Sequence, residues 1–340
     1  MESHPAEKTR DSLLTIAIPT YNRGAKLRRT LDLMGEQIAA AGAEGAVEIL
    51  VSDNASSDNT QDVLRAVQAG NGRVRWIRQE QNLGFDGNVC QLLLACRTPY
   101  VWFFGDDDIP LEGCIRRIWE RLAAVRPAVL LFSFVQPPGS TARTFRPDEC
   151  TGGIWDPRQQ IEMVSRFPKL SMFVLRREMS YADATQRFRE ICGSGYAFVS
   201  LALDALELGG QLELISEPLA SCDGDFNVLR VEAGVWGGYA RVFEHSFVSR
   251  VAPDLAERAR RDSYLTLVSF LWAWRRGTVT LEAQVESDYW RTLITLRPQW
   301  NWLLRSPKVL LFFLVLKITP VYGPRLIGLA SRLRRVAGNF

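Results

Sequence analysis

Three consecutive carboxylates, Asp106, Asp107 and Asp108, end the apolar stretch YVWFFGDDD at residues 100–108. Adjacent carboxylates repel one another, and Asp is unfavourable inside both helices and strands. A cluster of this kind at the end of a buried strand therefore needs a positive partner. Mg²⁺ and Mn²⁺ take oxygen ligands, often one or two carboxylates together with substrate phosphates. The triplet indicates half of a divalent-metal site that a bound diphosphate completes.

Two further polar clusters follow predicted strands. Pro19–Arg23 begins at the last residue of the apolar run LLTIAIP at 13–19, and Asp53 ends the run VEILVSD at 47–53 and is followed by Asn54. In an open parallel sheet, ligands bind beyond the carboxyl ends of the strands. The first strand-to-helix turn reads PTYNRGAK, without a P-loop or a GxGxxG motif. A Gly-rich phosphate cradle of the hydrolase or dehydrogenase kind is therefore disfavoured.

The first 135 residues alternate between strand and helix patterns. We predict strands at 13–19, 47–53, 73–79, 100–108 and 128–135. Helical spacing at 24–41 and in the segments after the second, third and fourth strands separates them, the last helix having Pro110 in its first turn. This order predicts an α/β fold with a doubly wound, mostly parallel sheet flanked by helices. Beyond residue 136 the pattern is weaker, with helices expected at 158–167, 196–209, 235–275 and 281–297.

Four ordered motifs carry a family resemblance: TIAIPTYNR, VEILVSDNASSDNT, NLGFDGN and VWFFGDDDI. In order and spacing they resemble the family 2 glycosyltransferases of the GT-A fold, especially the bacterial O-antigen abequosyltransferase-like subgroup. That resemblance implies a GT-A domain at 12–230, with a nucleotide-binding half at 12–135 and an acceptor half at 136–230. A helical C-terminal region at 231–340 would follow. The expected reaction moves a sugar, with inversion, from a nucleotide-diphosphate donor to a saccharide acceptor, and it depends on Mn²⁺ or Mg²⁺.

The same resemblance implies a set of site residues. The nucleotide-sugar site would contain Pro19, Tyr21, Arg23, Asp53, Asn54, Asn82, Phe85, Asp86, Asn88 and Asp106. Asp107 and Asp108 would be the metal ligands. The usual family motif is Asp-x-Asp-Asp, whereas Gly105 stands here in the first acidic position. Which two of the three acids bind metal is therefore open at this stage.

The general base is a second departure from the family pattern. Many members carry an acidic pair near residue 190, but this chain reads ICGSGYAF at 191–198. An inverting transfer needs a base within hydrogen-bond reach of the acceptor hydroxyl. Asp223 and Asp225, in the polar run CDGDFN, are the candidates for that role. The alternative is a non-catalytic nucleotide-sugar-binding relative, although such a relative has little reason to retain three costly carboxylates.

Composition bounds the other function classes. Among 340 residues, six Cys form no CxxC pair and two His are present, which disfavours zinc sites, disulfides and His-centred catalysis. The net charge of +3 does not point to a partner, and we expect no nucleic-acid binding. The polar N-terminus lacks the apolar core of a signal peptide, so we expect a cytoplasmic protein.

Charge is distributed unevenly at the C-terminal end. Residues 291–340 contain nine Lys and Arg but neither Asp nor Glu, and they surround the apolar run at 309–323. This run is shorter than the ~20 apolar residues of a spanning helix, and Lys317 and Pro320 interrupt it. We expect peripheral attachment to the inner face of the cell membrane, next to a lipid-linked acceptor. A buried core helix is the alternative.

Overall fold

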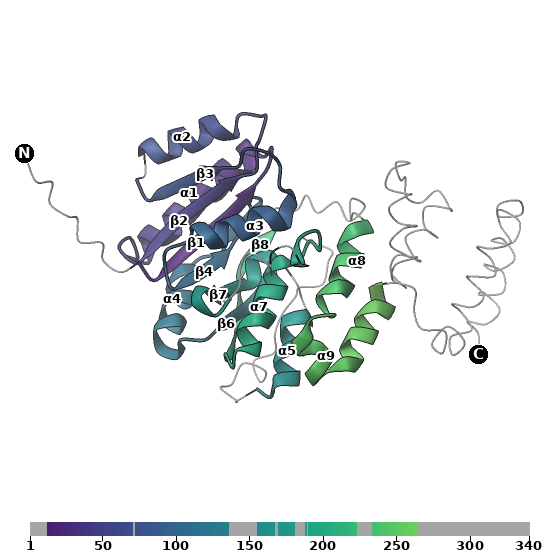
Figure 1. Cartoon of the computed structure of the whole chain (residues 1–340). Helices are drawn as coiled ribbons and strands as arrows, with labels where there is room; N and C mark the ends of the chain where they lie inside the picture. Colours follow the sequence, from purple (N-terminus) through teal and green to yellow (C-terminus); the bar gives the residue numbers. More distant parts are fainter. Residues whose placement is uncertain are drawn as a thin grey trace, which may run out of the picture.

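One eight-stranded sheet, flanked by helices on both faces, organises the chain (Figure 1). The computed structural model describes residues 12–70, 72–135, 155–166, 169–180, 188, 190–222 and 233–263. The strands are β1 Leu14–Thr20, β2 Val47–Asp53, β3 Val74–Arg78, β4 Tyr100–Phe103, β5 Asp108–Pro110, β6 Val129–Val135, β7 Phe173–Arg176 and β8 Leu212–Cys222. The helices are α1 Gly24–Ala40, α2 Thr60–Gly70, α3 Gly84–Ala95, α4 Cys114–Val125, α5 Pro157–Arg166, α7 Ala197–Glu207, α8 Ala233–Val242 and α9 Ser246–Val251.

Half of the sheet is parallel, in the order β3-β2-β1-β4. Every residue of β1 and each of the last five residues of β2 are buried, because helices cover both faces of the sheet. The chain runs from β1 through α1 to β2 on one side, and β4 adjoins β1 on the other side. The strand order therefore reverses between β1 and β4, which is where doubly wound sheets bind ligands. The predicted fold class is confirmed in this half.

The other half of the sheet is mixed. Strand β7 lies between β4 and β6 and is antiparallel to both, while β5 is antiparallel to β8. The sequence analysis missed β7, since four residues are too few to show a period. The strand predicted at 100–108 ends at Phe103, and the acids form a turn closed by a hydrogen bond from Asp108 N to Gly105 O at 3.2 Å. Pro110 lies in β5 rather than in a helix, and α4 begins at Cys114.

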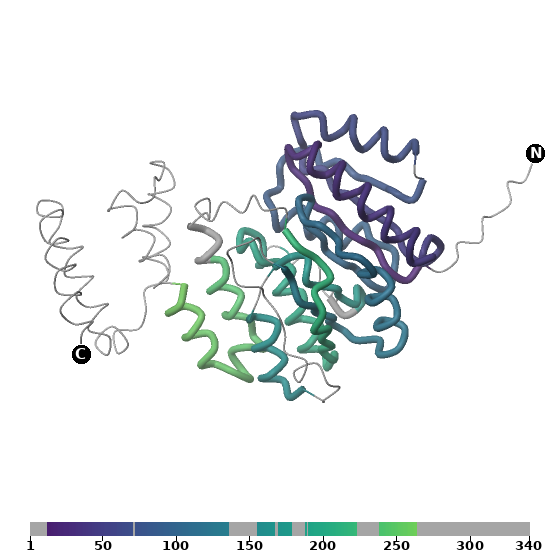
Figure 2. Tube along the Cα trace, turned by 180° about the vertical axis from the view of Figure 1, so that it is seen from behind, coloured from purple at the N-terminus to yellow at the C-terminus, as the bar shows by residue number. Residues whose placement is uncertain are grey.

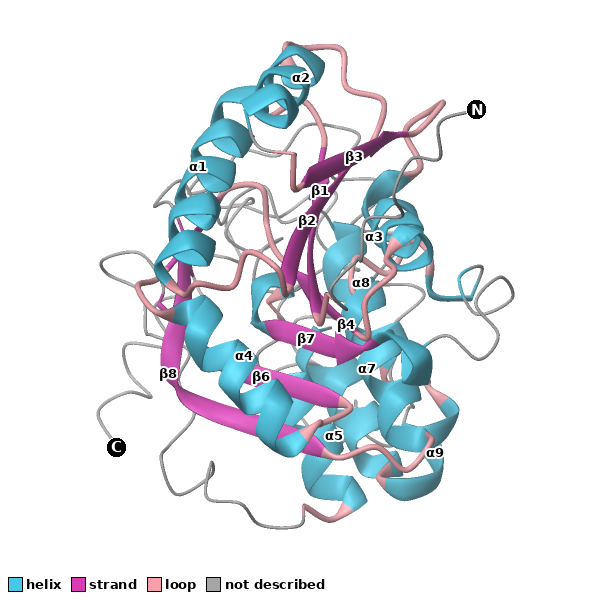
Figure 3. Ribbon diagram, turned by 90° about the vertical axis from the view of Figure 1, so that its left-hand side faces the viewer, coloured by secondary structure: helices cyan, strands magenta, loops and turns pink. Residues whose placement is uncertain are grey.

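The helices form two layers (Figure 3). Helices α1 and α4 cover one face, and α3, α5 and α7 cover the other. Helix α2 lies beside α1, as the view from behind also shows (Figure 2). The predicted period of α1 is confirmed, because Leu27, Leu31, Met34 and Ile38 are all buried. The expected C-terminal helical region begins with α8 and α9, and α9 packs against α5 and α7.

The apolar run at 309–323 and its basic flanks lie outside the described residues, so their expected membrane contact stays a prediction. Within the described part of the chain, every helix is too short or too polar to cross a bilayer.

Close packing of α8 on the turn before α7 gives a stability prediction. A Cβ at Gly238 would lie 1.6 Å from Ser194 O, so Gly238→Ala must push helix and turn apart. We expect a loss of about 1–3 kcal/mol in the free energy of unfolding, measured by urea denaturation. Gly70→Ala is the control, because a Cβ there meets no atom within 4 Å. Equal stabilities of the two variants would contradict this packing.

Candidate functional site

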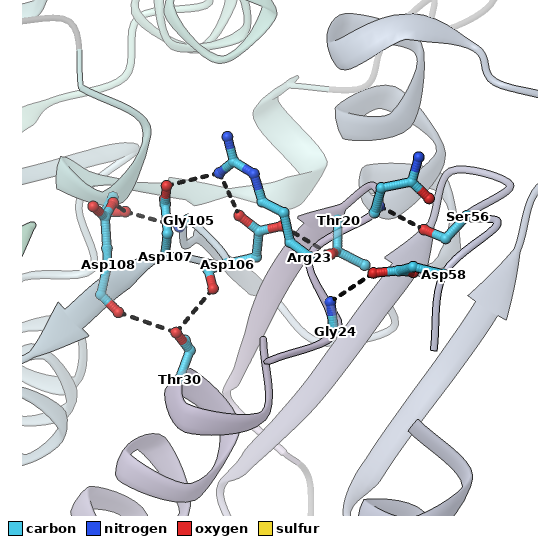
Figure 4. Close-up of polar contacts among 12 residues, drawn as sticks. Thr20, Arg23, Gly24, Thr30, Ser56, Asp58, Gly105, Asp106, Asp107 and Asp108 are labelled. Carbon is cyan, nitrogen blue, oxygen red and sulfur yellow. Dashed lines mark hydrogen bonds and ion pairs between the residues drawn. The ribbon is translucent and has the colours of Figure 1, made fainter. Parts of the chain in front are cut away.

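Arg23 neutralises the acidic turn after β4 (Figure 4). Its Nη1 donates to Asp106 Oδ1 at 3.0 Å and to Asp107 Oδ2 at 2.7 Å. The side chains of Arg23 and Asp107 are 49% and 33% exposed, whereas that of Asp106 is 7% exposed. Arg23 follows β1 and the acids follow β4, so the ion pairs join the two strands at which the strand order reverses. The positive partner required by the carboxylates is thus a side chain of this chain.

Two threonine hydroxyls hold the acidic turn in place through hydrogen bonds. Thr20 Oγ1 donates to Asp106 Oδ2 at 2.8 Å, and Thr30 Oγ1 lies within 3.2 Å of the carbonyl oxygens of both Asp106 and Asp108. Figure 4 shows the Thr30 hydroxyl between the backbone carbonyl oxygens of Asp106 and Asp108. These hydroxyls hold the backbone and one oxygen of Asp106 in place. The sequence analysis gave no role to either threonine: Thr20 lies inside the first motif but was not singled out, and Thr30 lies in a helix without a motif.

Burial makes the charge of this turn costly. Burial raises the pKa of the Asp106 carboxyl to about 6, with Arg23 opposing this rise and Asp107 adding to it. Burial likewise raises the pKa of Asp108, against the effect of Lys169. A desolvated carboxylate remains ionised near neutrality when a cation lies beside it. The turn is therefore built to hold positive charge.

Asp108 has partners of its own in the acidic turn. Its carboxylate accepts a hydrogen bond from Ser171 Oγ and lies 3.2 Å from Lys169 Nζ, and its side chain is 2% exposed. Ser171 Oγ also accepts from Gly105 N at 2.9 Å. Asp106 and Asp107 share the Arg23 cation, whereas Asp108 lies against Lys169 and Ser171, and the expected role of Asp108 as a metal ligand stays a prediction. Lys169 and Ser171 precede β7, the strand that the sequence patterns did not reveal.

Asp53 ends β2 with one oxygen unsatisfied. Its Oδ1 accepts from Ser56 N at 2.9 Å, while its Oδ2 is buried without a hydrogen-bond partner and lies 3.8 Å from Arg78 Nε. A buried acceptor without a donor costs free energy, about 1–3 kcal/mol in typical mutational data. The orphaned oxygen is the feature expected of a residue that receives a donor from a ligand.

The predicted amides form hydrogen bonds within the rim, the carboxyl edge of the sheet where β1, β2 and β4 end. Asn54 Nδ2 donates to Asn82 Oδ1 at 2.9 Å, and its Oδ1 accepts from Leu83 N at 2.8 Å. Asn88 exchanges hydrogen bonds with the side chain and carbonyl of Ser52 at 2.6 and 3.0 Å. Asn54 and Asn88 are 4% and 2% exposed. Their polar atoms support β2 and the start of α3, which leaves nucleotide contact by them an untested prediction.

Asp86 caps a different helix. Its carboxylate accepts from Gly195 N at 2.7 Å, from Ala197 N at 3.0 Å and from Ser194 Oγ at 3.2 Å, and it is 3% exposed. These N–H groups begin α7, whose first turn needs an acceptor. A negative charge is also favourable there. Asp86, which the resemblance places in the nucleotide-sugar site, is therefore hydrogen-bonded to the segment GSGY at 193–196 and to the start of α7. That segment has no carboxylate of its own.

Aromatic side chains remain exposed on the rim. Tyr21, after β1, and Phe85, in the first turn of α3, are 44% and 43% exposed. Asn82 is also exposed, whereas Pro19 is buried inside β1 and can shape the rim only through the backbone. Tyr21 and Phe85 thus have the accessible faces that stacking on a base requires.

The two candidate bases lie outside the described residues, so their position stays a prediction. Strand β8 ends at Cys222, which pairs with Asp108 in the register with β5. Asp223 is the next residue along the chain. The last described residue before it is therefore adjacent to the acidic turn.

Asp204, Glu207 and His245 form a second polar cluster, between α7 and α9. Nδ1 of His245 accepts from Phe247 N at 3.0 Å, so the proton is on Nε2, which lies 2.7 Å from Asp204 Oδ1. Coordination of a metal through Nε2 would require loss of this proton while Nδ1 still accepts. The cluster is explained as an N-cap of α9 tied to α7, and it does not need a metal.

The carboxyl edge of this sheet thus carries an acidic turn held by hydrogen bonds and a buried Asp53 oxygen without a hydrogen-bond partner, which are features expected of the nucleotide-sugar site of a GT-A glycosyltransferase. Residues 15–182 match the model of Glycosyl transferase family 2. Abequosyltransferase RfbV of Salmonella typhimurium is 27% identical over 232 residues, which cover 63% of this chain and 67% of that relative. A GalNAc(5)-diNAcBac-PP-undecaprenol beta-1,3-glucosyltransferase of Campylobacter jejuni is 26% identical over 39% of this chain and 41% of its own length. The family match and the two relatives identify the chain as a glycosyltransferase of family 2.

Solved structures agree on the fold. S. aureus TarS 1–349, in complex with UDP-GlcNAc, superposes with a TM-score of 0.57 at 12% identity, over 84% of this chain and 80% of that one. The mannosyltransferase PcManGT of Pyrobaculum calidifontis, in complex with GDP-Man and Mn²⁺, gives 0.50 at 13% identity, over 86% of each chain. Both are GT-A glycosyltransferases.

The capping role of Asp86 predicts a stability effect. Asp86→Asn places an amide NH₂ group against N–H donors and removes the charge at the start of α7. We expect a loss of about 1–2 kcal/mol in the free energy of unfolding. Nucleoside-diphosphate affinity, measured by calorimetry at a temperature where the variant is folded, should be unchanged. A large loss of affinity with full stability would instead place Asp86 in the ligand site.

Proposed function

We propose that this glycosyltransferase transfers a sugar from a nucleoside-diphosphate donor to a lipid-linked saccharide, with inversion and with a divalent metal. The observation that carries the proposal is the pair Asp106 and Asp107 sharing one cation beyond the switch point of the sheet. A diphosphate at this edge brings negative charge next to two carboxylates, which a divalent cation can bridge. Bulk anions alone would be repelled there.

The residues present fit such a metal. Asp106 Oδ1 and Asp107 Oδ2 both lie within 3.0 Å of one guanidinium nitrogen, so two oxygens already converge on one cation. An all-oxygen set suits Mg²⁺ or Mn²⁺. When bound, such a metal would neutralise the charge that develops on the leaving diphosphate. The Mn²⁺ complex of PcManGT supports a metal in this fold.

The nucleoside would lie between the ends of β1 and β2. The orphaned Asp53 Oδ2 can accept a donor of the base or ribose, and Tyr21 and Phe85 offer exposed rings for stacking. Arg23 can form charge-assisted hydrogen bonds to phosphate oxygens. Asp53 and Arg23 therefore read different parts of one ligand.

Inversion requires a base on the acceptor side. Asp223 and Asp225 are proposed for it, since the chain passes through Asp223 directly after the residue paired with Asp108. Asp86 cannot take that role in the described conformation, because both of its oxygens accept backbone N–H groups of α7.

The acceptor and the location form the last part of the proposal. The Campylobacter jejuni relative is named for a PP-undecaprenol saccharide, and RfbV is named an abequosyltransferase. The one-signed charge of 291–340 suits an anionic membrane surface. We therefore propose a cytoplasmic enzyme, peripheral on the inner face of the membrane, in bacterial surface-glycan synthesis.

Metal-dependent nucleotide binding tests the donor site. Calorimetric titration of the full chain with UDP, CDP, GDP and dTDP, with and without Mn²⁺, should give one preferred nucleotide whose binding needs the metal. Asp107→Asn should weaken that binding by roughly 10–100-fold, the loss of one charged ligand. Asp32→Asn is the control, since Asp32 pairs with Arg28 on the exposed face of α1.

Asp53→Asn in the same titration separates base from phosphate. It should weaken binding of the preferred nucleoside diphosphate and leave pyrophosphate binding unchanged. Asp107→Asn that binds nucleotide as tightly as the parent would contradict the metal site, and equal losses for both ligands would contradict the role of Asp53.

Vesicle binding tests the location. Sedimentation with anionic vesicles should bring down the full chain at low salt and less of it at high salt, because exposed charges are screened over ~8 Å at physiological ionic strength. Removal of residues 304–340 should abolish sedimentation. Full-length protein that stays in solution with vesicles at low salt would contradict a peripheral membrane location.

A further inference from the structure

Arg23 occupies the position that a metal held by both Asp106 and Asp107 would take. One nitrogen, Nη1, contacts Asp106 Oδ1 at 3.0 Å and Asp107 Oδ2 at 2.7 Å, and these are the converging oxygens of the turn. A guanidinium nitrogen and a divalent cation cannot both sit between the same two oxygens. Their charges also repel each other. Arg23 and the metal therefore exclude one another from this position.

The backbone of the turn and the Asp106 carboxylate are held by other residues, whereas the arginine side chain can leave. Thr20 holds the second oxygen of Asp106, and Thr30 holds the backbone of the turn. Arg23 precedes α1, and its side chain is 49% exposed. An exposed guanidinium can turn towards solvent or towards a nearby phosphate without unpacking the core. The part expected to move is thus the cation of the protein itself.

We propose that Arg23 is an exchangeable internal cation, which occupies the metal position in the free protein and moves to the diphosphate when donor and metal bind. This inference rests on the metal-dependent part of the proposed function. Released from the acids, the planar guanidinium can form paired hydrogen bonds with phosphate oxygens. One residue then opposes metal binding in the free protein and supports it in the nucleotide complex.

The exchange couples two ligands thermodynamically. A diphosphate that attracts Arg23 removes the competitor of the metal, so each ligand raises the affinity of the other by the same factor. Without the arginine, metal alone should bind more tightly and should gain less from nucleotide. This pattern differs from a simple loss of a phosphate contact, which would leave the affinity for metal alone unchanged.

The test is a Mn²⁺ titration of the full chain without nucleotide, in which the electron paramagnetic resonance signal of the free ion is measured at each step. Arg23→Gln should bind Mn²⁺ roughly ten-fold more tightly than the parent, since a charge-assisted competitor is removed. Arg23→Lys keeps the charge and should stay close to the parent. Arg28→Gln is the matched control. It removes the ion pair between Arg28 Nε and Asp32 Oδ2, which are 2.8 Å apart and lie outside the site, and it should not change the Mn²⁺ affinity.

Repeating the titration with saturating UDP, CDP, GDP or dTDP gives the second arm. The gain in Mn²⁺ affinity caused by the preferred nucleotide should be several-fold smaller in Arg23→Gln than in the parent. Equal Mn²⁺ affinities of the parent and Arg23→Gln in the first arm would overturn the exchange alone. If neither protein binds Mn²⁺ with any nucleotide, the metal-dependent proposal fails, and the exchange fails with it.

A measurement on the parent protein covers the case in which Arg23→Gln does not fold. The Nε–H signal of Arg23 in nitrogen-15 NMR, assigned with Arg23→Lys, should shift when Mg²⁺ and the preferred nucleotide are added together. A signal that keeps its position in the saturated complex would overturn the exchange.

Discussion

The need to neutralise the acidic turn after β4 governs the arrangement of the whole carboxyl edge. Asp106 is almost completely desolvated, and Asp107 adjoins it in the chain. Water cannot compensate this charge, so a cation must come from the protein or from a ligand. Arg23 supplies it from the neighbouring strand end, because β1 and β4 are adjacent and the strand order reverses between them. Fold and charge thus place the ligand position at the same edge.

Around that position, the polar residues divide into those that build the edge and those that face a ligand. The first group hydrogen-bonds to β2, the start of α3 and the start of α7, and it contains Asn54, Asn88 and Asp86. Asp58 has a similar part, since it accepts from Gly24 N at 3.1 Å and from Thr60 N at 3.0 Å at the starts of two helices. Arg23 and the exposed rings remain on the outside. An edge held by internal hydrogen bonds that leaves a few side chains exposed is suited to a ligand whose charge changes during reaction.

The sequence predicted the parallel half of the fold because its signals are local. A buried strand shows as a continuous apolar run, as in β2, and α1 shows as a spacing of three and four residues. Strand β7 and the contacts of Lys169 and Ser171 with Asp108 depend on pairing between distant segments, which no local pattern records. That Asp108 pairs with Lys169 and Ser171 while Arg23 pairs with Asp106 and Asp107 could not be foreseen for the same reason. Motif spacing located the acidic turn, but only the fold shows which two oxygens converge.

The cation position between Asp106 and Asp107 is tested most directly by anomalous diffraction from crystals of the full chain grown with Mn²⁺ and the preferred nucleoside diphosphate. We expect an anomalous peak within about 2.5 Å of oxygens of Asp106 and Asp107, with Arg23 turned to the diphosphate. A peak next to Asp108 or next to the cluster at His245, with Arg23 still between the carboxylates of Asp106 and Asp107, would contradict the proposed metal position.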